Sequence, residues 1–209
     1  MRLPPPTPVT DPLPYLWQGD LSGDAENLTG CVIRGESIAQ FDALLHEINP
    51  DAVRVDPARL QHLMQWLLAL PVEVAHDVLD RRLQRIEQLR AMLADADWNT
   101  GDAARLRLAK LLEYVDREDD LIADQEPMVG QLDDVLLLEL AWPTFASEAE
   151  DYNDFCHYRE DLHPIGSGSE QRAAWIRDRL AEIALWRHRL EVRGGHYPPG
   201  RPVALFRVI

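Results

Sequence analysis

Four aspartates are spaced closely enough in the sequence to act together as ligands of a metal ion. They are Asp120, Asp124, Asp133 and Asp134, and they lie within 15 residues. If the chain between them folds back, three carboxylates meet, and hard oxygen ligands suit Mg²⁺, Mn²⁺ or Ca²⁺. Packed without a cation, the carboxylates would repel one another and raise one another's pKa. The spacing differs from that of an EF-hand, whose D-x-[DN]-x-[DN]-G run does not occur.

A second pattern places a histidine three residues after an acid. It occurs as Glu73-x-x-His76 and as Asp154-x-x-His157. Residues three apart share one face of a helix, and two such pairs on facing helices are how bundles hold a pair of metal ions. The second pair has Asp where such centres use Glu. Because seven histidines and 36 acids produce these pairs readily by chance, we expect both histidines to be solvated surface residues and not ligands.

The four aspartates also have an interpretation that needs no ligand. An Asp at the start of a helix accepts hydrogen bonds from the first free backbone N–H groups, and Asp133 or Asp134 is placed to do so before the apolar run VLLLELAW. Pro127 and Gly130 are turn residues. We therefore expect a loop clamped between two helices and no cofactor, with Mg²⁺, Mn²⁺ or Ca²⁺ as the alternative.

The sequence gives little support to nucleophilic catalysis. Ser167 and Ser169 lie in a Gly-Ser-Gly-Ser run that follows a loop and not a strand, which a nucleophile elbow requires. Cys156 and His157 are adjacent, so on a helix they point apart. A glycine-rich phosphate loop does not occur. No catalytic residue is assigned, and we expect a protein that is not an enzyme, with a metal-dependent hydrolase built on the Asp cluster as the alternative.

Apolar residues recur at helical spacing along most of the chain, which predicts an all-α fold. A short helix is expected from Ser37, and Asp56 followed by Pro57 is a strong helix start. The next helices are expected at about 75–98 and up to about 115, then from Asp133 with a kink or a split at Pro143. A last helix follows a capping box formed by Ser167 and Glu170. Four arginines lie outside the apolar stripe of the long middle helix: Arg81, Arg82, Arg85 and Arg90.

The two ends of the chain differ from this helical region. Residues 1–22 hold six prolines and predict an extended arm, whose end Tyr15, Leu16 and Trp17 can pin to the body. The helical domain is expected at 23–192. Residues 193–209 predict an extended tail in which Val203, Leu205 and Phe206 can form a short strand. The fold expected is a multi-helix bundle with an acidic loop between two of its helices.

Residues 116–134 carry a patterned motif. It reads Asp120-Leu121-Ile122-Ala123-Asp124, then Pro127, Gly130 and Asp133-Asp134. In this spacing the chain, over about residues 100–145, resembles the YkvA-like family, a bacterial domain of unknown function with the pattern P-x-D-L-I-P-D-x-x-P-x-x-G-x-x-D-D. It departs from the pattern at Ala123, where the family usually has Pro. The resemblance implies a helical hairpin around the acidic loop and implies no reaction.

Charge is concentrated in the middle of the chain. The net charge is −15, and residues 113–161 hold 16 acids against two arginines. Such a surface repels nucleic-acid phosphates and anionic membranes, so we expect neither as a partner. We expect a protein partner with a basic surface that meets an acidic face, and arginines of the long middle helix and the last helix as internal partners for some of these acids. The oligomeric state is left open.

The compartment is inferred from the cysteines and the N-terminus. Cys31 and Cys156 do not form a disulfide framework or a metal-binding spacing. The N-terminus lacks the apolar core of a signal peptide, and no apolar run reaches the ~20 residues that cross a bilayer. We therefore expect a cytoplasmic protein that does not insert into membranes.

Overall fold

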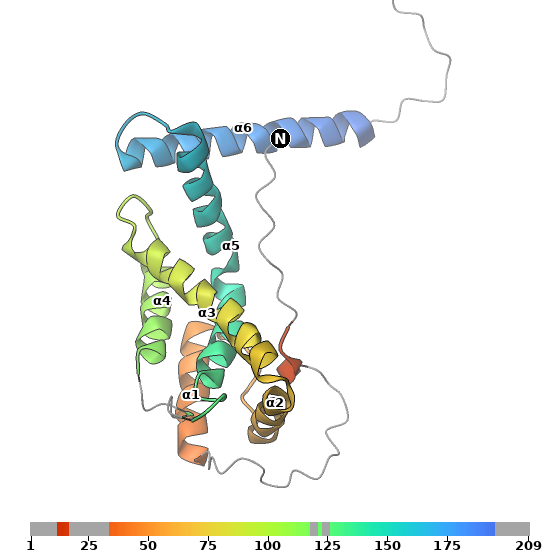
Figure 1. The fold of residues 1–209 in the computed structure, drawn as a ribbon. Coiled ribbons are helices and arrows are strands. Elements are labelled where there is room, and N and C mark those ends of the chain that lie inside the picture. The colour runs from red at the N-terminus through yellow and green to blue at the C-terminus, as the bar shows by residue number, and fades with distance from the viewer. Residues whose placement is uncertain (1–11, 17–33, 118–120, 123–125, 195–209) are drawn as a thin grey trace, which may run out of the picture.

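The computed structural model describes residues 12–16, 34–117, 121–122 and 126–194. These residues form helices joined by turns and contain no strand, which confirms the all-α fold (Figure 1). A 3₁₀ turn, η1, at Pro14–Leu16 precedes the α-helices. The α-helices are α1 at Gly35–Ile48, α2 at Pro57–Ala69, α3 at Val72–Ala94, α4 at Asp102–Val115, α5 at Leu132–Leu162 and α6 at Gly168–Gly194. Within the described part of the chain, no helix is long and apolar enough to cross a membrane.

Local sequence signals set two of the helix starts as predicted. The Asp56 carboxylate accepts hydrogen bonds from the N–H groups of Ala58 at 2.8 Å and Arg59 at 3.1 Å, and Pro57 occupies the first helical position of α2. Before α6, the Glu170 carboxylate accepts the N–H of Ser167 at 2.7 Å, which is the backward half of a capping box.

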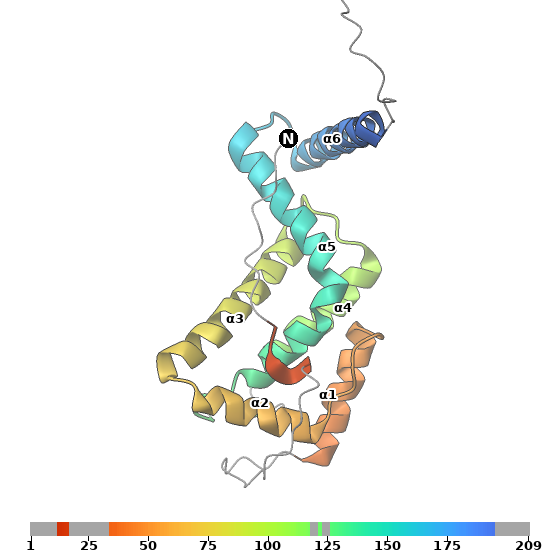
Figure 2. The ribbon, with the colours of Figure 1, turned by 90° about the vertical axis from the view of Figure 1, so that its right-hand side faces the viewer.

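Helix α5 is the central element of the fold. It packs against α1, α3, α4 and α6, and α3 and α5 lie side by side (Figure 2). Its residues 132–138 are all buried, because its first half is surrounded by the other helices. Of the kink or split predicted at Pro143, the split does not occur, since α5 continues through this exposed residue as one helix of 31 residues.

One arginine of α3 that lies outside the apolar stripe is nevertheless buried against α5. Arg82 is 4% exposed, and its guanidinium lies 3.4 Å from the Glu139 carboxylate of α5 and donates to the Val78 carbonyl at 2.9 Å. The Arg85 guanidinium stacks over the Trp142 ring at 4.7 Å. The face of α3 that contacts α5 is therefore wider than the apolar stripe of α3. Arginine side chains occupy the part of this face that lies outside the stripe.

The described part of the N-terminal arm is anchored to the body. Leu13 and Tyr15 are buried, and the Tyr15 hydroxyl accepts the N–H of Asp56 at 2.9 Å. Tyr15 thus pins the arm as predicted. The remainder of the predicted arm lies outside the described residues, and so does the predicted strand at Val203, Leu205 and Phe206. Helix α6 continues to Gly194, beyond the predicted domain end at 192.

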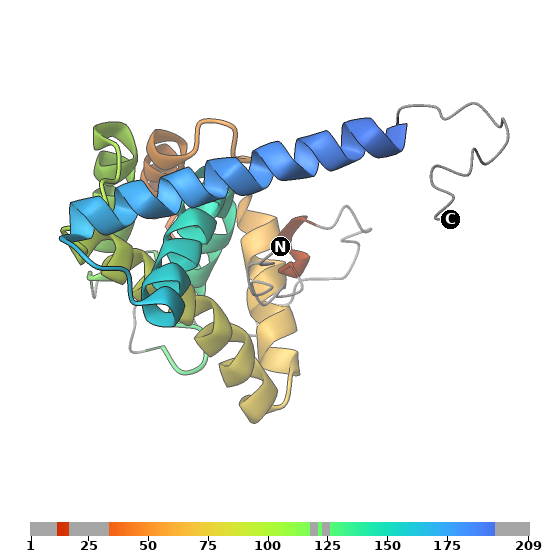
Figure 3. The ribbon, with the colours of Figure 1, turned by 90° about the horizontal axis from the view of Figure 1, so that it is seen from above.

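Helix α6 crosses one end of α5 and extends past the rest of the molecule (Figures 1 and 3). Its first half is fixed by an aromatic cluster at the turn between α3 and α4. The buried Trp175 ring lies 5.6 Å from the Trp98 ring and 5.7 Å from the Phe155 ring, measured between centroids. Arg172 stacks over Trp98 at 4.9 Å. The second half of α6 has exposed side chains on all sides.

Candidate protein-binding site

Asp133 holds the loop between α4 and α5 against the core. Its side chain is fully buried, and Oδ2 accepts the Tyr114 hydroxyl at 2.8 Å and the N–H groups of Leu121 and Ile122, each at 3.2 Å. The Tyr114 hydroxyl in turn accepts the Leu121 N–H at 3.1 Å. Asp133 therefore ties the end of α4, the loop and the start of α5 together.

The predicted helix-capping role of the two adjacent aspartates is wrong. The residue before α5 is Gln131, which makes no side-chain capping bond, and Asp133 and Asp134 lie inside the first turn of the helix. At these positions both side chains face the buried interior, and Asp133 bonds across to the loop. The difference from the prediction arises because the packing of α5 against the other helices determines which side chains of its first turn face the interior.

Burial sets the ionisation of Asp133. Desolvation raises the pKa of this carboxyl from 3.8 to about 6, although the hydrogen bonds from Tyr114 and from the loop amides favour the charged form. Among the described residues, no hydrogen-bond donor reaches its other oxygen, Oδ1. The carboxyl therefore gains or loses its proton at about pH 6.

The remaining predicted residues of the acidic loop have separate positions. Pro127 is exposed, and Gly130 is buried in the turn, where its N–H donates to the Glu126 carbonyl at 3.0 Å. The left-handed residue of this turn is Met128, with φ 70°, and not Gly130. Asp120 and Asp124 lie outside the described residues, so the predicted meeting of carboxylates is a hypothesis. Within the described ranges, no three Asp, Glu, His or Cys side chains are grouped to hold a metal ion.

The two acid–histidine pairs lie at opposite ends of the α3–α5 packing. His76 is near the start of α3, whereas the end of α3 is bonded to the later part of α5 through Arg159 and Asp95 at 2.8 Å. At 1.5 Å per residue, His76 and Asp95 are about 28 Å apart along the helix axis. The His157 ring nitrogen Nδ1 lies 2.7 Å from the Asn153 carbonyl. Glu73 and His76 therefore cannot share a metal pair with Asp154 and His157.

Part of the acidic stretch pairs with arginines of α3 and α6, as predicted. Arg90 binds the Asp116 carboxylate with two hydrogen bonds, at 2.6 and 3.2 Å. These bonds hold the pKa of Asp116 below its usual value. The Arg82 and Arg85 guanidinium groups lie 3.4 and 3.9 Å from Glu139, and Arg179 of α6 lies 3.6 Å from Asp154. The acidic stretch is thus partly neutralised within the fold.

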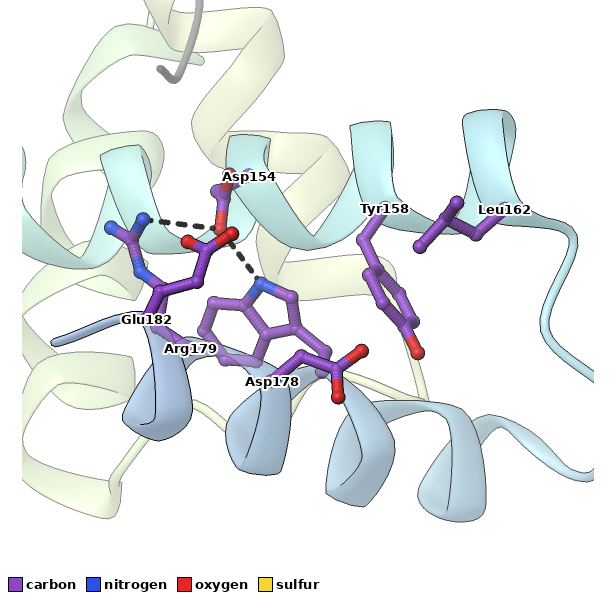
Figure 4. A pocket seen from close by; sticks show the side chains of 7 residues that line it. Asp154, Tyr158, Leu162, Asp178, Arg179 and Glu182 are labelled. Atoms are coloured by element: carbon purple, nitrogen blue, oxygen red, sulfur yellow. Dashed lines mark hydrogen bonds and ion pairs between the residues drawn. The ribbon is translucent and has the colours of Figure 1, made fainter. Parts of the chain in front are cut away.

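The acids that face the junction of α5 and α6 surround a small open notch (Figure 4). We call it the acidic notch, and its volume is about 80 Å³. In Figure 4, side chains from α5 meet side chains from α6 across the opening. The notch is lined by Asp154, Tyr158, Leu162, Trp175, Asp178, Arg179 and Glu182.

The floor of the notch is rigid, whereas its rim carries charges available to a ligand. Asp154 accepts the Trp175 indole N–H at 2.8 Å and is also near Arg179, so it is held in place. Asp178 and Glu182 form no ion pair with any described residue. Burial and the Asp178 carboxylate raise the pKa of the Tyr158 hydroxyl. Three carboxylates against one guanidinium leave the notch negative.

A larger hollow of about 390 Å³ lies between the start of α1 and the end of α4. Its lining mixes signs, with Arg34 and Arg117 against Glu36, and Arg117 is already paired with Glu113 at 2.8 Å. It therefore has no single charge preference. The acidic notch combines a net negative charge, from three carboxylates and one guanidinium, with aromatic walls, and it is the stronger candidate for recognition.

Sequence reasoning identified Asp154 as part of an acidic face but did not identify Asp178 and Glu182. These residues are separated from Asp154 by a loop and belong to a helix whose net charge is positive. The sequence pattern that could have indicated the notch is the helical spacing of its lining residues, at 154, 158 and 162 on α5 and at 175, 178 and 182 on α6. Comparison of the chain with protein-family models, curated protein sequences and solved structures gives no match. The YkvA-like resemblance is therefore a prediction.

Proposed function

We propose that the protein is a non-enzymatic binding module of the cytoplasm, and that its acidic notch receives a basic side chain of a protein partner. The observation that carries this proposal is the convergence of three carboxylates and two aromatic rings at one small opening. A guanidinium group donates paired hydrogen bonds to carboxylates and stacks on aromatic faces, so an arginine matches both features of the notch.

The size and the surroundings of the notch fit one side chain of a larger surface. A volume of about 80 Å³ holds the end of one long side chain. At its edge Leu162 is 59% exposed, so an apolar side chain is available to the rest of the partner. Interfaces of this kind place a charged anchor in a pocket and exclude water around it.

The proposal is tested with a short arginine-containing peptide and with a peptide of equal length in which glutamine replaces arginine. Binding is measured by calorimetry at low salt. We expect the arginine peptide to bind more tightly. The double substitution Asp178→Asn, Glu182→Gln should weaken it about tenfold, because it removes both rim charges that have no ion-pair partner among the described residues.

The matched control removes one charge of the acidic stretch far from the notch. Glu113→Gln changes a carboxylate that is 69% exposed on α4. It should leave the affinity within about twofold, since an exposed charge more than a Debye length away, about 8–10 Å, is largely screened. If Glu113→Gln and a single change at Glu182 weaken binding equally, the notch is not the binding site and only the overall charge acts.

A divalent cation in the α4–α5 loop is the second candidate function. It is favoured by Asp133 Oδ1, a buried carboxylate oxygen that no donor among the described residues reaches. A cation that binds the folded chain and not the unfolded chain raises its melting temperature, and the rise grows with the logarithm of the cation concentration above Kd. Thermal melts with Mg²⁺, Mn²⁺ or Ca²⁺, each against a chelator, decide it. A rise in Tm that Asp133→Asn removes supports the cation, and unchanged melts exclude it.

A further inference from the structure

Helix α6 carries a continuous apolar stripe on a face that no other described element covers. Five large apolar side chains along it are between 39% and 60% exposed: Ile176, Leu180, Ile183, Trp186 and Leu190. The first half of α6 crosses α5 and the second half extends past the body (Figure 3). By position in the helix, Ile176 and Leu180 belong to the first half, and the other three to the second. Exposed apolar surface of this extent marks an interaction site.

The spacing of the stripe is symmetric about its central residue. From Ile183 the next apolar positions are three and seven residues away in both directions, at Leu180 and Ile176 on one side and Trp186 and Leu190 on the other. When two copies of such a helix pack antiparallel about a two-fold axis at Ile183, every apolar side chain meets an apolar side chain. Ile176 then opposes Leu190, and Leu180 opposes Trp186 of the second copy.

Charges flanking the stripe fit the same arrangement. Arg177 and Glu191 each follow a residue of the stripe, Ile176 and Leu190, by one position. In the antiparallel pair they lie on the same flank, so Arg177 of each copy faces Glu191 of the other, and the two-fold axis forms this pair twice.

The overall charge also favours α6 as the place where two copies meet. Helix α6 holds six arginines against four acids, while the remainder of the chain holds 32 acids against 15 basic residues. Two copies therefore repel each other less at α6 than at any contact between their acidic bodies.

We propose that a second copy of this chain covers the stripe, and that the two α6 helices pack antiparallel about Ile183. The proposal is independent of the proposed function.

The first test measures the mass of the full chain by light scattering over a wide range of concentration. We expect the mass to rise from the monomer value of 23.8 kDa toward twice that value. Ile183→Glu should abolish the rise. Leu185→Glu is the matched control, because Leu185 is 58% exposed on the opposite side of the same helix, and it should leave the rise unchanged. A monomer at every concentration, or equal loss in both variants, overturns the proposal.

The second test asks whether the two α6 helices are antiparallel, and it uses charged residues in place of an apolar substitution. Arg177→Glu alone and Glu191→Arg alone should each weaken dimerisation several-fold, because each places like charges opposite each other. The double variant Arg177→Glu, Glu191→Arg should restore it. If the single changes weaken dimerisation and the double change does not restore it, the antiparallel pairing is contradicted.

Discussion

Asp133 is the residue whose chemistry differs most from what its type alone predicts. Its raised pKa means that the folded protein binds this proton more tightly than the unfolded chain does. The stabilisation is therefore fully present below pH 3.8, the pKa of the unfolded chain, and is lost as pH rises through about 6. The whole effect is about 3 kcal/mol, of which roughly 1 kcal/mol is lost between about pH 5 and 7.

The change Asp133→Asn isolates this effect. An amide cannot ionise, so the variant does not lose this stabilisation as pH rises. The free energy of unfolding of the variant minus that of the original protein, measured by urea denaturation, should therefore rise by roughly 1 kcal/mol between about pH 5 and 7. Other titrating groups are the same in both proteins and cancel in the difference. A difference that stays constant over this range shows that Asp133 does not titrate there.

Tyr114 is the second residue of the clamp. Its hydroxyl both donates to Asp133 and accepts the Leu121 N–H. Tyr114→Phe should cost about 1–3 kcal/mol of unfolding free energy, because it leaves buried polar groups with fewer partners. Tyr158→Phe is the comparison at the acidic notch, where the Tyr158 hydroxyl bonds to the Asp178 carboxylate, and it should cost less in the same denaturation experiment. Equal costs would mean that the clamp bonds contribute no more than the bond at the notch.

Among the elements, α6 depends on a single cluster for its position. Trp175 is buried against Trp98 and Phe155, and it also holds Asp154. Trp175→Ala should release the first half of α6 at a cost of about 3–5 kcal/mol. Hydrogen exchange should then show loss of protection in α6, while α3 and α5 stay protected.

Trp186 on the same helix provides the control for this experiment. It is 50% exposed, so Trp186→Ala should leave the exchange of the first half of α6 unchanged when the protein is dilute. If Trp175→Ala instead unfolds the whole chain, α6 is part of the core and not an element docked on it.

The elements that the sequence predicts well are those defined by local signals. The start of α2 at Asp56 and Pro57, and the helical periodicity, follow from the chemistry of neighbouring residues. The buried place of Arg82, the loop clamp of Asp133 and the unsplit α5 depend on which elements pack together. No spacing within one segment encodes such packing, so these features were missed or assigned differently.

At the scale of the whole molecule, the acidic stretch has two uses. Arg90, Arg82 and Arg179 neutralise part of it inside the fold. Where α5 meets α6, Asp154 of this stretch also meets Asp178 and Glu182 of α6, so the acidic notch joins acids about 20 to 30 positions apart in the chain. The sequence indicated an acidic face and a basic partner, but only the packing of α6 on α5 shows which acids form one site.

The indole N–H of Trp175 tests the central claim most directly, because it lines the notch and donates to Asp154. Its NMR signal should shift progressively as the arginine peptide is added, while that of Trp66 on α2 stays in place. The Asp178→Asn, Glu182→Gln variant should need about tenfold more peptide for the same shift, and added salt should also weaken the shift. A peptide that binds to saturation without moving the Trp175 signal would contradict the notch as the site of recognition.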